Sequence, residues 1–193
     1  MSTAPTTASG LGTDQLDQLD FRHVMSHLPT GVVAVTGVEP DSARPVGLVV
    51  GSFASLSLEP PLVAFSIART SSSWPRVRRG GRFSASVLAE GQDAVCRSLS
   101  RRSGDKFADV PWHPSPDGAP RVNGAVAWID CEPEQELDGG DHLIVIARVL
   151  RMATGPGEPL VFHKGRLGSY RDTVAATPPA ARSRRSSATP PTA

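Results

Sequence analysis

The feature of this sequence that most constrains its fold is a series of short apolar runs, rich in β-branched residues, between residues 31 and 163. Most of them are bounded by Gly, Pro, Asp or Ser, which is typical of strands separated by turns. They do not alternate with helical patterns of ten to fifteen residues, so a parallel α/β sheet is not indicated. The sequence predicts a mainly β chain whose strands form a closed or nearly closed barrel. The predicted strands are 31–36, 45–50, 62–67, 82–88, 125–131, 142–150 and 160–163.

Helical signals are fewer and shorter. Short helices are predicted over 21–28, where Pro29 stops the helix, over 73–79, and over 92–100, which has an apolar face. Residues 101–123 are predicted to form a long loop, and connections of that length are commonly functional.

Composition and length bound the remaining possibilities. A chain of 193 residues fits one domain. The polar ends predict disordered segments over 1–18 and 172–193, which leaves a folded unit over 19–171. The net charge of +1 provides no field for nucleic acid, and no apolar run approaches the ~18 residues of a membrane span. Two cysteines without a C-x-x-C pattern and a first segment unlike a secretory signal favour the cytoplasm.

Several common catalytic motifs are absent from the sequence. There is no G-x-G-x-x-G after a strand, no G-x-x-x-x-G-K-[ST] and no G-x-S-x-G, which argues against a Rossmann domain, a P-loop NTPase and an α/β-hydrolase. His23 and His27 are spaced like paired metal ligands on a helix, but no third ligand is indicated nearby. We therefore expect no metal site.

Four segments are candidates for ligand contact. Serines between the two apolar runs of Gly47 to Phe65 need hydrogen-bond partners, and three serines before Trp74 can meet an anion at a helix start. Each segment alone is equally consistent with an ordinary turn, a backbone-bonded serine cluster or a helix cap. The four segments are Pro29-Thr30-Gly31, Gly47 to Phe65, Arg69 to Pro75, and Gly139-Gly140-Asp141-His142.

Together, the segments resemble the flavin reductases of two-component monooxygenase systems in order and spacing. The resemblance extends from Phe21 to Tyr170. It rests on F-R-H-V-M-S-H-L-P-T-G-V-V-A-V-T, G-L-V-V-G-S-F-A-S-L-S-L-E-P-P-L-V-A-F, T-S-S-S-W-P-R-V-R-R-G-G-R-F, G-D-K-F, A-V-A-W-I-D-C, G-D-H-L-I-V-I-A-R-V and G-E-P-L-V-F-H-K-G. It implies a split β-barrel and a homodimer with flavin near the subunit interface. It also implies reduction of FMN or FAD by NADH or NADPH, and delivery of the reduced flavin to a partner monooxygenase.

The resemblance also implies roles for individual residues. His142 would lie beside the nicotinamide, orienting it. Relatives often have Asn at Ser86 and an aromatic residue at Arg166, so this chain departs from the pattern at both positions. The residues expected to contact flavin are Pro29 and Thr30 beside the ring, Val50, Gly51 and Ser52 at its pyrimidine edge, Ser57 near the ribityl chain, Ser71, Ser72, Ser73 and Lys106 at the phosphate, and Phe107 over the ring.

Two alternatives remain open at the level of sequence. A barrel of this kind could retain its flavin, for storage or for electron transfer to another acceptor. The R-S-R-R cluster at residues 182–185 could instead bind an acidic partner, although such clusters are commonly just solvated.

Overall fold

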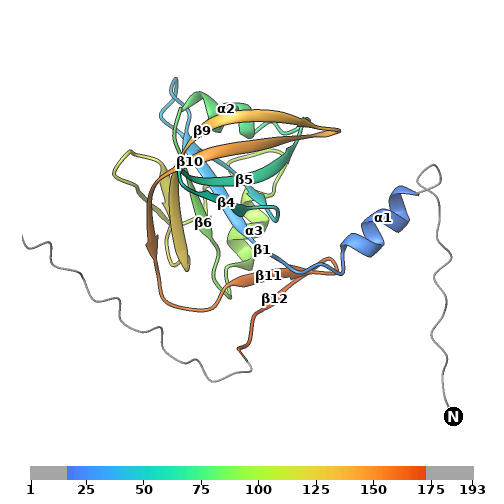
Figure 1. Ribbon diagram of the computed structural model, residues 1–193. Helices are drawn as coiled ribbons and strands as arrows, with labels where there is room; N and C mark the ends of the chain where they lie inside the picture. The colour runs from blue at the N-terminus through green and yellow to red at the C-terminus, as the bar shows by residue number, and fades with distance from the viewer. Residues whose placement is uncertain (1–16, 173–193) are drawn as a thin grey trace, which may run out of the picture.

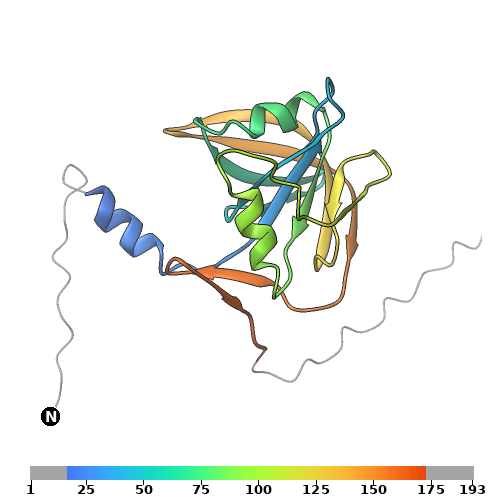
Figure 2. The same cartoon turned by 180° about the vertical axis from the view of Figure 1, so that it is seen from behind.

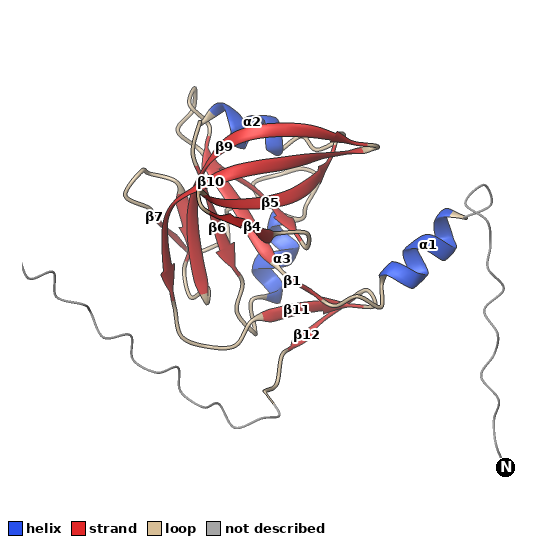
Figure 3. Ribbon diagram, in the orientation of Figure 1, coloured by secondary structure: helices blue, strands red, loops and turns tan. Residues whose placement is uncertain are grey.

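The computed structural model describes residues 17–172 (Figure 1). The predictions for the two end segments therefore fall, apart from residues 17, 18 and 172, outside the described part of the chain. Helices and strands are distinguished by colour in Figure 3. The helices are α1 (Gln18–Met25), α2 (Trp74–Arg79) and α3 (Asp93–Leu99). The strands are β1 (Thr30–Gly31), β2 (Val33–Val38), β3 (Pro45–Val50), β4 (Ala54–Leu58), β5 (Pro61–Ala68), β6 (Phe83–Val87), β7 (Trp112–Pro114), β8 (Pro120–Val122), β9 (Ala127–Gly139), β10 (His142–Thr154), β11 (Leu160–His163) and β12 (Arg166–Ser169).

Seven strands form one antiparallel sheet in the order β3-β2-β6-β9-β10-β5-β4. The long strand β10 pairs with β9 on one side and with β5 on the other, so it joins the two halves of the sheet. The sheet curls around the core, as Figures 1 and 2 show from opposite sides, while β3 and β4 remain as separate edges. This arrangement confirms the expected mainly β, split-barrel fold.

The barrel interior is filled by side chains that alternate along the strands. In β5, Val63, Phe65 and Ile67 are buried, and the residues between them are only partly so. Phe65 lies at the centre of an aromatic group, with its ring centroid 5.5 Å from that of Trp74 and 5.7 Å from that of Phe83. The edge-to-face packing of these rings fixes α2 against the sheet.

A second core cluster lies on the outer face of β2, under α3. Val33 and Val35 point into the barrel, whereas Val32 and Ala34 join the second cluster with Leu99. Because β2 is buried on both faces, its first three residues form an apolar run with Val32 instead of an alternating pattern. The same cluster anchors α3, and α3 in turn positions the loop that follows it.

The structure corrects three sequence-based expectations. The predicted loop over 101–123 contains the hairpin of β7 and β8. The strands predicted over 125–131 and 142–150 extend to Gly139 and Thr154, because β9 and β10 pair well beyond the core. Their outer halves are exposed on both faces, so no hydrophobic alternation marks them. Strands β1, β4 and β12 were also not expected.

Helix α1 lies apart from the barrel in both opposite views (Figures 1 and 2). It has no buried residue, although it carries Leu19, Phe21 and Val24. Strands β1, β11 and β12 form a separate sheet that leads from beneath α3 to this helix. Within residues 17–172, no helix has both the length and the apolar character needed to cross a membrane.

Candidate functional site

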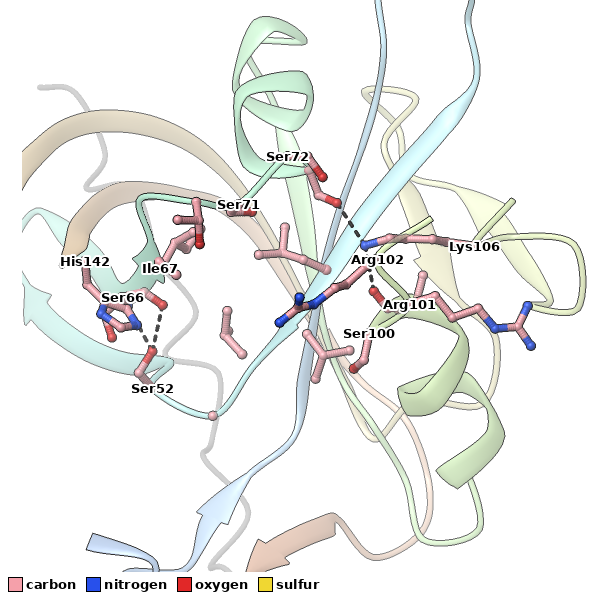
Figure 4. Close-up of a pocket in the computed structure, with 18 residues that line it drawn as sticks. Ser52, Ser66, Ile67, Ser71, Ser72, Ser100, Arg101, Arg102, Lys106 and His142 are labelled. Carbon is pink, nitrogen blue, oxygen red and sulfur yellow. Dashed lines mark hydrogen bonds between the residues drawn. The ribbon is translucent and has the colours of Figure 1, made fainter. Parts of the chain in front are cut away.

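A cavity of about 900 Å³ opens beside the ends of β3 and β5 (Figure 4). One wall, which we call the strand side, comprises residues 48–52, 66–68 and His142. The opposite wall, the loop side, comprises residues 70–73, 99–102 and Lys106. Eight predicted site residues meet here although they are far apart in sequence: Val50, Gly51, Ser52, Ser71, Ser72, Ser73, Lys106 and His142.

Hydrogen bonding joins the strand side into one surface. The Ser52 hydroxyl donates to the carbonyl of Ser66 at 3.2 Å and accepts from its backbone N–H at 2.9 Å. The Ser52 side chain thus ties the end of β3 to β5, and its hydroxyl proton is already committed. A ligand at this wall would meet backbone groups of residues 50–52 more than the hydroxyl itself.

Gly51 is required by the close approach of Thr30. A Cβ at position 51 would lie 2.8 Å from the Thr30 Oγ1, which is closer than such atoms pack. Thr30 lies on the far side of Gly51 from the main cavity, in the wall of a smaller cavity of about 200 Å³. Thr30 therefore supports the strand side from behind.

His142 begins β10, directly after the turn formed by Gly140 and Asp141, and faces the cavity beside Ser52 and Ser66 (Figure 4). Its Nδ1 lies 2.7 Å from the Asp141 carboxylate, which leaves Nε2 available to a ligand. This hydrogen bond lowers the pKa of Asp141 from its ordinary value. Gly140 has a φ of +73°, a conformation that favours glycine and lets the chain turn tightly before the histidine.

The serines of the loop side do not cap α2 as the sequence suggests. Ser73 is the N-cap residue but makes no capping bond, and the Trp74 N–H donates instead to the Ser71 hydroxyl at 3.3 Å. The side chain of Ser72 has no hydrogen-bond partner within the described residues. Hydroxyl protons on Ser71 and Ser72 remain available to an anion in the cavity.

Lys106 anchors the loop side. Its ammonium donates to the Ser73 hydroxyl at 2.9 Å and to the carbonyls of Leu99 and Gly47 at 3.0 and 3.2 Å. All three protons are used, so the ammonium provides charge and position in place of a free donor. Burial and then the nearby Arg76 lower the pKa of Lys106. Because Lys106 donates to Ser73, the proton of that hydroxyl points elsewhere and can be given to a ligand.

Four predicted site residues lie away from this cavity. Pro29 lines a separate cavity beside β11 and β12. Thr30 lies behind Gly51, as described above, and Ser57 lies on the edge strand β4. Phe107 is buried in the second core cluster, with its ring 3.3 Å from the Cβ position of Gly47. None of the four lines the main cavity.

The cavity also contains residues that the motifs did not indicate. Ser66 and Thr70 line it, as do Ser100 and Arg102 from the loop after α3. The Arg101-Arg102 pair at the start of a long loop could have indicated an anion site, because charged side chains at such a position do not pack in the hydrophobic core. Ser66 was less visible, since its place opposite Ser52 depends on the pairing of distant strands.

Within residues 17–172, no three His, Cys, Asp or Glu side chains cluster as metal ligands do. His23 and His27 lie on or next to α1, where the His27 Nδ1 meets the His23 carbonyl at 3.0 Å. The donors of the main cavity are instead backbone N–H groups, hydroxyls and cations. Such a set fits a flat, acceptor-rich ring that carries a phosphate, as in a flavin nucleotide.

Comparison with known proteins agrees with this fit. A family model described as the flavin reductase like domain matches residues 25–171. A flavin reductase of Pseudomonas putida is 41% identical over 156 residues, which cover 80% of this chain and 91% of that protein. The reductase subunit HsaB of a flavin-dependent monooxygenase from Rhodococcus jostii is 42% identical over 156 residues, covering 80% of this chain and 79% of that protein. Among solved structures, the NADH:FAD oxidoreductase of Streptomyces globisporus, in complex with NAD and FAD fragments, aligns with a TM-score of 0.78 and 31% identity, covering 87% of this chain and 100% of that one.

Proposed function

Since the chain belongs to the flavin reductase like domain family, we propose that it is an NAD(P)H-dependent flavin reductase. It reduces FMN or FAD and supplies the reduced flavin to a partner monooxygenase. The observation that carries this proposal is the main cavity, which unites a backbone-lined wall, a histidine and a phosphate-binding end. The names of the relatives support it, since one is a flavin reductase and another the reductase subunit of a flavin-dependent monooxygenase.

The strand side would hold the flavin ring. Val50, Gly51 and Ser52 line the cavity, and their backbone groups would bond the polar edge of the ring. The bond between Ser52 and Ser66 keeps that edge rigid. A preformed surface of this kind needs no rearrangement when the ligand binds.

The loop side would hold the phosphate. The hydroxyls of Ser71, Ser72 and Ser73 are candidate donors, and Lys106 places its charge behind Ser73. Charge-assisted hydrogen bonds of this type are about twice as strong as neutral ones. The phosphate is thereby fixed at the end of the cavity opposite His142.

His142 would orient the nicotinamide. When both cofactors are bound, the nicotinamide supplies a hydride and the flavin accepts it, which is chemistry that the cofactors carry themselves. The protein contributes position, because the reacting atoms must approach to ~3–3.5 Å. Asp141 holds the imidazole of His142 by its Nδ1, so Nε2 is presented to the ligand in a fixed direction. We assign His142 to orientation and not to proton transfer.

Steady-state oxidation of NADH and NADPH tests the proposal, with FMN, FAD and riboflavin each supplied in excess. We expect turnover with at least one pairing of pyridine nucleotide and flavin. The absence of oxidation with every pairing would overturn the reductase function. A flavin that survives purification and gel filtration, together with slow oxidation of NADH in excess free flavin, would instead favour the flavin-retaining alternative.

We further propose that the protein is a homodimer. Several large apolar side chains are uncovered in a single chain, and Leu58 on the edge strand β4 is 92% exposed. Helix α1 adds Leu19, Phe21 and Val24, and its sequence neighbour Leu28 is also exposed. A second copy is the simplest cover for a helix that carries apolar side chains and has no buried residue in the described part of the chain. Light scattering after gel filtration should give twice the chain mass, and a monomer at micromolar concentration would refute the proposal.

The compartment is proposed from the cysteines. Cys96 and Cys131 are both free, and burial raises the pKa of the Cys131 thiol to about 12. Unpaired cysteines and a need for reduced pyridine nucleotide are consistent with the cytoplasm.

A further inference from the structure

A second cavity, of about 660 Å³, lies beyond the phosphate end of the first. The two cavities share four lining residues, namely Ser72, Ser73, Arg102 and Lys106. A ligand whose phosphate is held by the serines therefore lies at the entrance to the second cavity. Its volume is within the range of about 300–1,000 Å³ that is usual for small-molecule sites.

The second cavity is strongly cationic. Arg44, Arg76, Arg102 and Lys106 line it, and the only carboxylate among its lining residues is that of Asp105. The Asp105 side chain is engaged by the backbone N–H of Phe107 at 2.9 Å. Excess positive charge in a concave site attracts an anion and raises its local concentration.

Two of these cations have no partner of their own. Most arginines in residues 17–172 are ion-paired, and Arg76 is held by Glu39 at 3.0 Å. By contrast, the guanidinium groups of Arg44 and Arg102 make no ion pair or hydrogen bond with any described residue. Figure 4 shows the Arg102 guanidinium pointing into the main cavity, whereas that of Arg101 points away. Unpaired guanidinium groups beside a phosphate-binding end are suited to a second phosphate, since they present a planar fork of donors.

An aromatic side chain completes the second cavity. Trp112, which begins β7, lines it and is 36% exposed. Its ring meets Phe107 edge to face, with centroids 6.5 Å apart, so its orientation is fixed by a buried neighbour. An indole held in this way offers a stacking surface for a purine base.

We propose that the second cavity binds the adenosine monophosphate half of FAD, and that this chain consequently selects FAD over FMN. The inference rests on the proposed flavin reductase function and specifies its substrate. FMN would end at the shared wall and leave Arg44 and Trp112 unused. FAD continues past that wall with a second phosphate, which Arg44 and Arg102 bind, and with an adenine, which stacks on Trp112.

Binding of oxidised FAD and FMN, measured by calorimetry without pyridine nucleotide, tests the proposal. We expect the wild-type protein to bind FAD at least about tenfold more tightly than FMN, as one stacked base and one paired phosphate would provide. Arg44→Ala and Trp112→Leu should each weaken FAD binding by about three- to tenfold and leave FMN binding unchanged. Arg97→Ala is the matched control and should preserve both affinities, because Arg97 is an exposed arginine on α3 that lies outside both cavities and has no ion pair with a described residue.

Other outcomes would overturn the proposal and are distinguishable from one another. Equal affinities of the wild type for FAD and FMN would exclude the second cavity as an adenosine site while leaving the reductase function intact. An effect of Arg44→Ala on the KM for NADPH, with FAD binding unchanged, would assign the cavity to the pyridine nucleotide instead. Failure of the wild type to bind either flavin would remove the proposed function together with this inference.

Discussion

The two sides of the main cavity differ in whether their polar groups are already hydrogen-bonded within the protein. On the strand side, polar groups are already bonded to each other, as Ser52 is to the backbone of Ser66. On the loop side, Lys106 is likewise saturated, but Arg102 and the Ser72 hydroxyl keep their hydrogen-bonding capacity for a ligand. The strand side thus provides a rigid surface that positions a ligand, and the loop side provides positive charge and free hydrogen-bond donors.

This difference suggests how one barrel can combine a rigid ring site with an adaptable phosphate site. Groups in the sheet are held by the ladder from β3 to β10, so their positions are set by the fold. Groups in the loop after α3 are held by the partly buried ammonium of Lys106. Substitutions on the two sides should therefore differ in whether stability or ligand recognition is affected.

The largest effect is expected from Lys106→Met. Removal of the ammonium takes one donor from each of three oxygens, those of the Ser73 hydroxyl and the Gly47 and Leu99 carbonyls. The free energy of unfolding should therefore fall by about 3 kcal/mol. Urea unfolding measures this, and flavin affinity should fall as well. Lys164→Met is the matched control, because Lys164 is exposed and its side chain has no partner among residues 17–172. Equal stability of the two variants would mean that the loop side does not depend on Lys106.

His142→Ala is expected to have the next largest effect, on the strand side. Loss of the orienting imidazole should raise the KM for NADH about tenfold, which corresponds to ~1.4 kcal/mol, with a smaller change in kcat. Steady-state kinetics at saturating flavin separates the two constants. An unchanged KM and an unchanged kcat would show that His142 has no role in orienting nicotinamide.

Ser52→Ala tests whether the strand side is prebuilt. The Ser66 N–H would lose its acceptor in a partly exposed position, so we expect a loss of about 1 kcal/mol in the free energy of unfolding. Ser55→Ala is the control, since Ser55 is exposed on β4 and its hydroxyl makes no hydrogen bond within the described part of the chain. If Ser52→Ala weakened flavin binding and left stability unchanged, the hydroxyl would be a direct ligand contact.

The smallest effect concerns pH and the paired arginine of the second cavity. The pKa of Glu39 is lowered from 4.5 to about 2, mainly by its hydrogen bond from Arg76 and further by the Ser42 hydroxyl and the charge of Arg79. The folded state therefore gains stability from Glu39 above pH 4.5, and this gain is lost as the pH falls toward 2. The difference in unfolding free energy between wild type and Glu39→Gln should shrink over that range. A difference independent of pH would show that Glu39 stabilises the fold by packing alone.

The parts of the fold visible in the sequence are those with a strong local pattern. The β-branched run that became β2 and the apolar face of α3 were predicted to within a few residues. Residues 132–139 of β9 and residues 151–154 of β10 were missed, because pairing between exposed strands leaves no periodic signal. Phe107 belongs to the second core cluster and lines the second cavity instead of the main one, a placement that the sequence could not give because a lone aromatic in a loop does not reveal which way it faces.

The candidate site was predictable in part for the same reason. Ser71 to Ser73 and His142 follow turns that can be recognised in the sequence, and the structure brings them into one cavity. The contribution of Ser66 depends on the pairing of distant strands, and although the Arg101-Arg102 pair is visible in the sequence, only the folded chain shows that Arg102 reaches the cavity. Site residues supplied by long-range geometry are the ones that sequence patterns leave out.

Hydrogen–deuterium exchange with and without oxidised FAD tests the central claim most directly, since that claim is that the cavity between the strand side and the loop side binds flavin. We predict slower exchange at backbone amides of residues 48–52, 66–73 and 99–107 when flavin is present. Amides of β11 and β12, around the separate cavity that contains Pro29, should exchange at the same rate with and without flavin. Protection confined to β11 and β12, with none at residues 48–52 and 70–73, would contradict the account.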